Sequence, residues 1–285
     1  MYDFWIILSF ALLASGFLCA GAFVATTYFQ ARRITRGELG WPSLRCYIHE
    51  TLCTWFTQAL WPIGWFVGEG FGQRAAPGAR RPIVLVHGWT QNRTNFVWLA
   101  RFLRRRGLGP FFGFNYNSFQ PIEQSAKSLA AFVERVAAHT GAKEIDLVCH
   151  SLGGLVARTY VDLMGGHGYV QRVVTLGTPH CGVGYANPLF GPSVRDMHSE
   201  TGFVVQLGQA PLPASVSYLS IYSTHDNIVY PGSASCLGQR GTDIRVSGFG
   251  HFGILFCEQV AAHVHHALAG EDVTKVPAAT SLSAA

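Results

Sequence analysis

The sequence predicts an α/β domain with a mostly parallel sheet and helices on both of its faces, preceded by an N-terminal transmembrane helix. Between residues 80 and 270, short apolar runs typical of buried strands alternate with longer segments of helical periodicity. One apolar run ends in a serine among small residues, and an uncharged run fills most of the N-terminal region. A segment of this length buries a substantial core, so we expect residues 80–270 to form one domain.

Residues 1–31 are predicted to hold the membrane-spanning helix. The uncharged residues 4–29 would form a helix roughly 39 Å long, which exceeds the ~30 Å hydrocarbon core of a bilayer. A cleavable signal peptide is the alternative, but it should begin with a basic region and have a shorter apolar stretch. Here Asp3 precedes the run, and three arginines, the first of them Arg32, follow it. The positive-inside rule then places the following loop in the cytoplasm.

Residues 32–79 form an aromatic-rich linker between this helix and the α/β domain. Within it, residues 52–71 are rich in Trp and Phe but contain Gln58, Pro62 and Glu69. We expect this stretch to lie along the membrane interface, which keeps the α/β domain cytoplasmic. A second, irregular span would instead place the domain on the outer side, and simple packing of the aromatic side chains onto the domain is a third interpretation.

The strand predicted at residues 145–148 leads a serine into a sharp turn. The turn reads Cys149-His150-Ser151-Leu152-Gly153-Gly154, and helical periodicity follows it. In a strand–serine–helix turn of this kind the residues two before and two after the serine must be small. Cys149 stands where glycine is usual, and cysteine is compact enough to fit. Ser151 is therefore the candidate nucleophile, and an ordinary serine-containing turn is the alternative.

A serine hydroxyl needs a general base, a carboxylate that orients the base, and donors for an oxyanion. Asp226 follows the strand pattern of residues 218–223 and is the candidate acid, with Asp196 and Asp243 as rivals. The alternative role for Asp226 is to cap a loop as an Asx-turn residue. His251 lies in a glycine-rich loop before the last helical pattern and is the candidate base.

Two further strand patterns end in turns that bear on the same site. The run at residues 83–86 breaks at Gly88-Trp89, where a turn would expose a backbone N–H. The backbone N–H groups of Leu152 and Trp89 are the candidate oxyanion donors. The run at residues 173–176 leads into a turn that would wall the pocket, in which His180 is a weaker candidate base.

Together these patterns resemble the α/β-hydrolase superfamily and, within it, the bacterial lipase and esterase group. The resemblance spans most of residues 81–270 and implies an α/β-hydrolase fold and a carboxylic-ester hydrolase that works through an acyl-enzyme without a cofactor. It assigns the nucleophile to Ser151, the general acid and base to His251, the orienting acid to Asp226, and the oxyanion donors to Leu152 and Trp89. The matching residues are His87-Gly88-Trp89, His150-Ser151-Leu152-Gly153-Gly154, Gly177-Thr178-Pro179-His180, Asp226 and His251.

The predicted substrates are lipid or acylglycerol esters. This expectation rests on the membrane helix, the aromatic stretch and a possible lid at residues 183–213. The alternative is that this irregular segment is a surface loop that does not cover the pocket. A thioesterase or phospholipase with the same triad, or a catalytically silent membrane-bound binding protein on this fold, are the alternatives. We expect a protein anchored in the bacterial inner membrane, and residues 271–285 to be a disordered tail.

The net charge and the cysteine content exclude few further classes of function. The net charge is +5, but no binding motif accompanies it, so nucleic acid is not an expected partner. We expect His263, His265 and His266 to lie on a solvated helix face rather than in a metal site. Seven cysteines indicate no full disulfide framework. A bridge between Cys181 and Cys236 is expected only if the domain faces an oxidising compartment.

Overall fold

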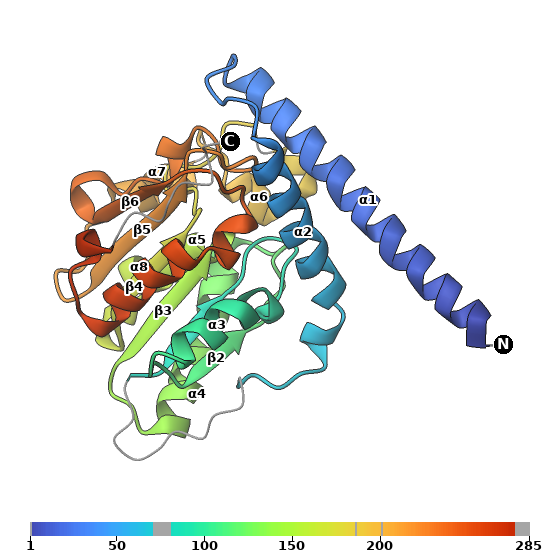
Figure 1. Cartoon of the computed structure of the whole chain (residues 1–285). Helices are drawn as coiled ribbons and strands as arrows, with labels where there is room; N and C mark the ends of the chain where they lie inside the picture. Colours follow the sequence, from blue (N-terminus) through green and yellow to red (C-terminus); the bar gives the residue numbers. More distant parts are fainter. Residues whose placement is uncertain (1, 71–80, 186, 201, 277–285) are drawn as a thin grey trace.

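In a computed structural model of the chain, which describes residues 2–70, 81–185, 187–200 and 202–276, six parallel strands form one sheet. Their order across the sheet is β2-β1-β3-β4-β5-β6 (Figure 1). The predicted mostly parallel sheet is therefore confirmed. The strands are β1 (Ile83–Val86), β2 (Phe111–Phe114), β3 (Ile145–His150), β4 (Val170–Leu176), β5 (Ser217–Ser223) and β6 (Thr242–Val246).

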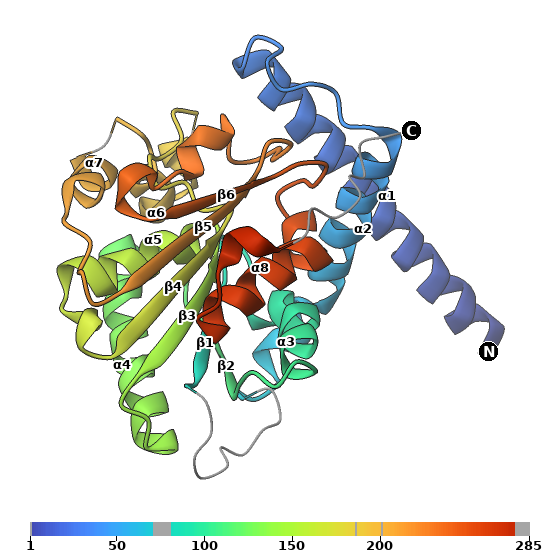
Figure 2. The same cartoon turned by 60° about the vertical axis from the view of Figure 1, so that its left-hand side comes forward.

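Helices cover both faces of this sheet, as Figure 2 shows. Successive side chains of a strand point to opposite faces, so Leu147 of β3 joins one apolar core and Val148 joins the other. The predicted placement of helices on both faces is confirmed. On the first face lie α4 (Ile122–Thr140) and α5 (Leu152–Arg158), and on the second lie α3 (Val97–Arg104) and α8 (Glu258–Ala269).

Several helical segments differ in detail from the sequence pattern. The pattern after Ser151 is divided into α5 and a π-helical turn, Thr159–Leu163. Within the irregular residues 183–213 the structure has α6 (Pro192–Asp196) and α7 (Gly202–Gln209). Val194, Met197 and Leu207 from this region are buried in the core on the α4 and α5 face, so much of it packs beside the sheet.

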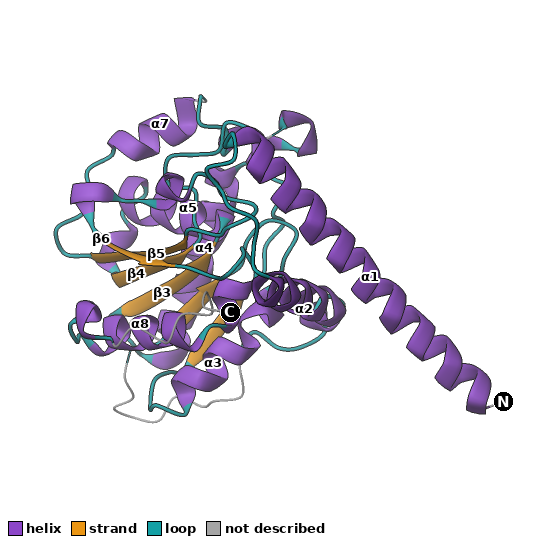
Figure 3. Ribbon diagram, turned by 45° about the horizontal axis from the view of Figure 1, so that its top comes forward, coloured by secondary structure: helices purple, strands orange, loops and turns teal. Residues whose placement is uncertain are grey.

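Two N-terminal helices, α1 (Tyr2–Ile34) and α2 (Leu44–Leu60), pack against each other; α2 lies on the α/β domain, and the N-terminal part of α1 extends beyond the domain (Figure 3). The Tyr47 hydroxyl donates to the carbonyl of Gly21 at 2.8 Å, and the Phe17 and Trp55 rings meet edge to face. Among the described residues, Leu13–Ile34 is the one segment long and apolar enough to cross a membrane, judged by length and composition.

Helix α2 has its apolar side facing outward and its polar side buried. This is the reverse of an amphipathic helix on a protein in water, which buries its apolar stripe. The outward stripe consists of Leu44, Ile48, Leu52 and Phe56, and the buried side includes Glu50, Thr51, Thr54 and Thr57. Leu52 and Phe56 of this stripe line a cavity beside α3, where the Phe56 and Phe256 rings meet edge to face.

The C-terminal region differs from the sequence-based expectation at His263. His263 is buried, and its Nδ1 lies 2.9 Å from the carbonyl of Val273, because the turn Val273–Lys275 folds back onto α8. The prediction of a solvated face is wrong for His263. Residues 71–80 of the expected linker and residues 277–285 of the expected disordered tail lie outside the described residues.

Candidate active site

Ser151 lies in the tight turn between β3 and α5. Its backbone has φ 54° and ψ −127°, a conformation that costs a non-glycine residue about 1–3 kcal/mol. Three hydrogen bonds hold the turn. The Ser151 N–H donates to the Leu176 carbonyl at 2.9 Å, and the Ser151 carbonyl accepts from the N–H of Gly154 at 3.0 Å and from the Thr178 hydroxyl at 2.9 Å.

Close backbone approaches explain why small residues flank this serine. A Cβ on Gly153 would collide with the carbonyl oxygen of Val86, and a Cβ on Gly88 would lie 2.9 Å from the Cβ of Ser151. Cys149 occupies the position where glycine is usual, and its side chain is fully buried in the core beneath α4 and α5. The thiol therefore fills core space without obstructing the turn.

Asp226 and His251, which follow β5 and β6, are in direct contact. Asp226 Oδ2 lies 2.8 Å from His251 Nδ1, and both side chains are almost fully buried. The other oxygen, Oδ1, accepts from the backbone N–H groups of Ile228 at 2.8 Å and Val229 at 2.7 Å. Because an ionised carboxylate only accepts hydrogen bonds, His251 carries its proton on Nδ1 and presents Nε2 as a proton acceptor.

The electrostatic surroundings favour a charged His251. Burial alone lowers the pKa of His251, but the charge of Asp226 and its hydrogen bond raise it, as does the charge of Glu50 on α2. The net effect is a raised pKa, so the imidazole takes up a proton more readily than an exposed histidine does.

Ser151 and His251 line the same cavity, whose volume is about 620 Å³. A volume of this size falls in the usual range of ~300–1,000 Å³ for small-molecule sites. Asp226 does not line the cavity and lies behind the His251 ring. The cavity lies between the carboxyl ends of the strands and the helices α1 and α2. Its α1 wall is made by Gly16, Cys19, Ala20, Phe23, Thr27 and Gln30.

The two candidate oxyanion donors belong to two different turns, the one after β3 and the one after β1. Leu152 is the first residue of α5, where an N–H has no acceptor within the helix. Trp89 lines the cavity and belongs to the turn after β1. That turn is held by two hydrogen bonds, from the N–H of Gly88 to Gln91 Oε1 at 3.1 Å and from the N–H of Thr90 to the Ser118 hydroxyl at 2.9 Å.

Sequence reasoning assigned no role to His150 and Gln91, which connect the parts of the site. His150 Nδ1 lies 2.9 Å from Gln91 Oε1, and His150 Nε2 lies 3.0 Å from the carbonyl of His251. Complete burial holds the pKa of His150 well below its usual value. His150 therefore links the turn of Ser151 to the loop of His251. The position of His150 directly before Ser151 is the feature of the sequence that could have indicated this role.

Sequence reasoning also missed Glu50. This α2 residue is completely buried, and its carboxylate accepts hydrogen bonds from the backbone N–H groups of Phe252 at 2.9 Å and Gly253 at 2.7 Å, directly after His251. The partners are separated by about 200 residues of chain, so no local pattern connects them.

The rival residues have other partners. Asp196 Oδ2 accepts from the N–H of Ile122 at 3.0 Å, and the carboxylate of Asp243 accepts from the N–H groups of Leu237 and Gly238. His180 is buried with Nε2 at 2.9 Å from the Thr175 hydroxyl. None of these three lines the cavity that contains Ser151.

Other candidate sites lie away from Ser151. Within the described ranges, one group of side chains, His265, His266 and Glu271, is close enough to share a metal ion, and none of the three lines the active-site cavity. Cys181 and Cys236 are both free thiols, with Cys181 Sγ 3.9 Å from the Cys236 carbonyl.

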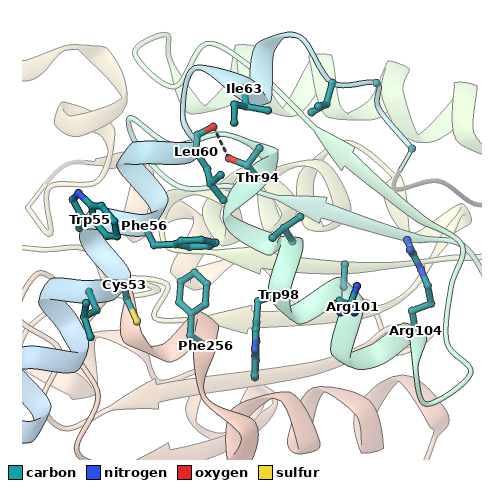
Figure 4. Close-up of a pocket in the computed structure, with 16 residues that line it drawn as sticks. Cys53, Trp55, Phe56, Leu60, Ile63, Thr94, Trp98, Arg101, Arg104 and Phe256 are labelled. Carbon is teal, nitrogen blue, oxygen red and sulfur yellow. Dashed lines mark hydrogen bonds between the residues drawn. The ribbon is translucent and has the colours of Figure 1, made fainter. Parts of the chain in front are cut away.

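A second cavity of about 920 Å³ lies between α2 and α3 (Figure 4). The rings of Phe56, Trp98 and Phe256 line it, and Arg101 and Arg104 lie at one end. It contains none of the candidate catalytic residues, so its larger size does not make it the reaction site.

The chain is similar in sequence to known thioesterases and lipases. A model of the palmitoyl protein thioesterase family matches residues 82–230. A lysosomal thioesterase, PPT2-B, from Xenopus laevis is 27% identical over 107 residues, covering 36% of this chain and 37% of the relative. A triacylglycerol lipase from Pseudarthrobacter phenanthrenivorans is 35% identical over 117 residues, covering 38% of this chain and 36% of the relative. The chain thus matches little more than a third of the length of these relatives.

Solved structures confirm the α/β-hydrolase fold. Lipase B of Aspergillus fumigatus has a TM-score of 0.63 at 17% sequence identity, covering 72% of this chain and 57% of the lipase. The mature form of the Bacillus licheniformis lipase BlEst2 has a TM-score of 0.54 at 20% identity, covering 64% of this chain and 89% of that chain.

Proposed function

Because this chain belongs to the palmitoyl protein thioesterase family, we propose that it is a serine hydrolase that cleaves carboxylic esters of fatty acyl chains with the triad Ser151, His251 and Asp226. One observation carries the proposal. His251 contacts Asp226 at 2.8 Å and lines the same cavity as Ser151. A base oriented by a buried carboxylate beside a serine in a strained turn is the arrangement that acyl transfer requires.

The reaction proceeds in two halves. His251 Nε2 removes the proton of Ser151 as its Oγ attacks the ester carbonyl, and the N–H groups of Leu152 and Trp89 stabilise the oxyanion. The alcohol then leaves with the proton from Nε2, and the acyl group stays on Ser151. In the second half a water molecule gives a proton to Nε2 as its oxygen attacks the acyl carbonyl. The bond from the acyl group to Ser151 Oγ then breaks, Oγ takes the proton back from Nε2, and the acid is released.

The cavity wall supports an apolar acyl group as the substrate part that binds there. The α1 residues that line it are small or apolar at Gly16, Ala20 and Phe23, and Ile228 and Phe252 line it from the domain. Burial of each methylene contributes about 0.8 kcal/mol. A long acyl chain therefore gains more from this cavity than a short one.

Replacing Ala20 with leucine should narrow the cavity from its α1 side. We expect kcat/KM for long-chain p-nitrophenyl esters to fall by about 10-fold, in line with the 1–3 kcal/mol that one misfitting methylene costs in an apolar pocket, with little change for the acetate ester. Ala22→Leu is the matched control, because Ala22 is exposed on the same helix and does not line the cavity. Equal losses for both variants, or for all chain lengths, would contradict this acyl site.

Thioester cleavage is the second candidate, favoured by the family match. Esters and thioesters pass through similar tetrahedral intermediates, so the same residues serve both reactions. To distinguish the two functions, kcat/KM is measured with the same protein preparation for the p-nitrophenyl ester of palmitic acid and for a palmitoyl thioester. The substrate with the higher kcat/KM identifies the preferred reaction.

We further propose that α1 anchors the enzyme in the bacterial inner membrane. The apolar length of Leu13–Ile34 and the outward apolar stripe of α2 support this location. The exposed aromatic side chains of Trp41, Trp61 and Trp65 suit the interface between lipid headgroups and water. Protease accessibility in intact membrane vesicles identifies the side on which the α/β domain lies.

A fluorophosphonate probe tests the proposed nucleophile. It should label the purified full-length protein, and Ser151→Ala should abolish the labelling because the attacking oxygen is gone. Ser193→Ala is a control, since Ser193 is also buried but does not line the cavity. Folded wild-type protein that stays unlabelled would exclude a serine hydrolase.

A further inference from the structure

The loop that carries His251 packs against a helix from outside the family-matched residues 82–230. Glu50 of α2 reaches this loop, and its two carboxylate oxygens each accept one backbone N–H, Oε1 from Phe252 and Oε2 from Gly253. An ionised acceptor makes hydrogen bonds about twice as strong as a neutral one. The two bonds therefore fix the backbone immediately after His251.

The sequence of this loop is adapted to the carboxylate. A Cβ on Gly250 would collide with the Glu50 carboxyl group, and a Cβ on Gly253 would lie 2.9 Å from Glu50 Oε2. The glycines on either side of His251-Phe252 are thus required for Glu50 to approach. This requirement explains a glycine-rich loop that would otherwise weaken the positioning of His251.

Helix α1 holds the neighbouring acid loop. The Tyr28 hydroxyl donates to the carbonyl of His225 at 3.0 Å, and Asn227 Nδ2 donates to the Thr27 hydroxyl at 2.6 Å. Asn227 Oδ1 in turn accepts from the backbone N–H of His251 at 3.0 Å. Both N-terminal helices therefore contact the loops that carry the acid and the base.

We propose that Glu50 is a positioning residue of the active site, which fixes the His251 loop and places a second negative charge near the imidazole. The proposal rests on the proposed function of His251 as the base. A carboxylate at this position favours the imidazolium that forms as Ser151 attacks. Its effect on His251 is additional to that of Asp226, which contacts the ring directly.

The titration of Glu50 follows from its surroundings. Burial raises the pKa of Glu50 to about 7, against the lowering effect of the N–H groups of Phe252 and Gly253. The folded protein therefore holds this proton between about pH 4.5 and 7, and stability falls as the pH rises through that window. The negative charge of Glu50 near His251 develops as the pH rises through about 7. The ionisable groups that face Glu50 are Tyr28 of α1, Cys46, His49 and Cys53 of α2, Asp226 of the acid loop and His251.

Glu50→Gln tests the proposal, because glutamine keeps the shape and loses the charge. We expect the acid limb of the kcat/KM profile to move to lower pH and kcat to fall severalfold, because the charge that raises the pKa of His251 is removed. Glu50→Asp, which keeps the charge, should retain the wild-type acid limb. Thr51→Val is the matched control, since Thr51 is buried beside Glu50 but its hydroxyl makes no hydrogen bond to the loop. A uniform loss of kcat in Glu50→Gln with an unmoved profile would overturn the proposal.

A direct measurement separates this proposal from the proposed function. In the Ser151→Ala background, the pKa of His251 is read from the NMR titration of ¹³C-labelled histidine, with the signal assigned by its loss in His251→Ala. We expect a lower pKa of His251 when Glu50→Gln is added, and an unchanged value overturns the role of Glu50. Turnover that survives in Ser151→Ala would instead refute the proposed function and leave this measurement valid. The melting temperature of Glu50→Gln should also decline less than that of the wild type between pH 5 and 8.

Discussion

Asp226→Asn is expected to lower kcat by roughly 10⁴-fold, the loss that follows when a triad histidine is held in the wrong tautomer. The geometry gives the reason. Oδ1 of Asp226 accepts two backbone N–H groups, so the carbonyl oxygen of an asparagine would occupy that position. Its NH₂ group would then face His251 Nδ1 and force the ring proton onto Nε2. A ring with its proton on Nε2 cannot accept the proton of Ser151.

The rate is measured with a p-nitrophenyl ester at a pH above the titration of His251. Asp243→Asn is the control, because Asp243 accepts two backbone N–H groups at a different loop and does not line the cavity. Its kcat should stay within a few-fold of wild type. If Asp226→Asn loses less than tenfold while Asp243→Asn is inactive, the acid has been assigned to the wrong residue.

Asp162→Ala is expected to be the most destabilising single change, with a loss of about 3–5 kcal/mol in the free energy of unfolding. Asp162 and Arg158 form an ion pair at 3.0 Å, and both side chains are fully buried. Removing the carboxylate leaves the guanidinium charged in the core, where Arg158 Nη2 also donates to the carbonyl of Leu207. For a domain of this size the melting temperature should fall by roughly 6–20 °C.

The double variant Arg158→Met/Asp162→Leu is the control. It removes both charges and fills most of the space, so it should recover most of the lost stability, since buried ion pairs are often replaced by apolar residues at little cost. A double variant as unstable as Asp162→Ala would show that hydrogen bonds to neighbours, such as that from the Tyr218 hydroxyl to Asp162, dominate over the unpaired charge.

The candidate site residues that the sequence indicated all follow strand ends. Ser151, Asp226 and His251 each come after an apolar run, and the carboxyl ends of parallel strands meet at one edge of a sheet. Local patterns therefore sufficed to select them. The contact between Asp226 and His251 involves residues only 25 apart, within two consecutive strand–loop units.

The sequence did not reveal what helix α2 contributes to the site. Residues 52–71 were expected to lie along the membrane interface, and Glu50 had no expected role, whereas the structure buries Glu50 against the His251 loop. This contact joins residues about 200 positions apart, so a local pattern does not indicate it. His263 was misjudged for a related reason, since the turn at Val273–Lys275 that covers it was expected to be disordered.

The contribution of α1 to the cavity bears on proteolytic processing. An N-terminal leader that a peptidase removes normally leaves a complete catalytic domain behind. Here Ala20 and Phe23 line the cavity, and Thr27 and Tyr28 hold the loop of Asp226. Cleavage after α1 would therefore remove one wall of the cavity and two hydrogen bonds to the loop of Asp226, so we expect it to abolish activity rather than to produce a mature enzyme.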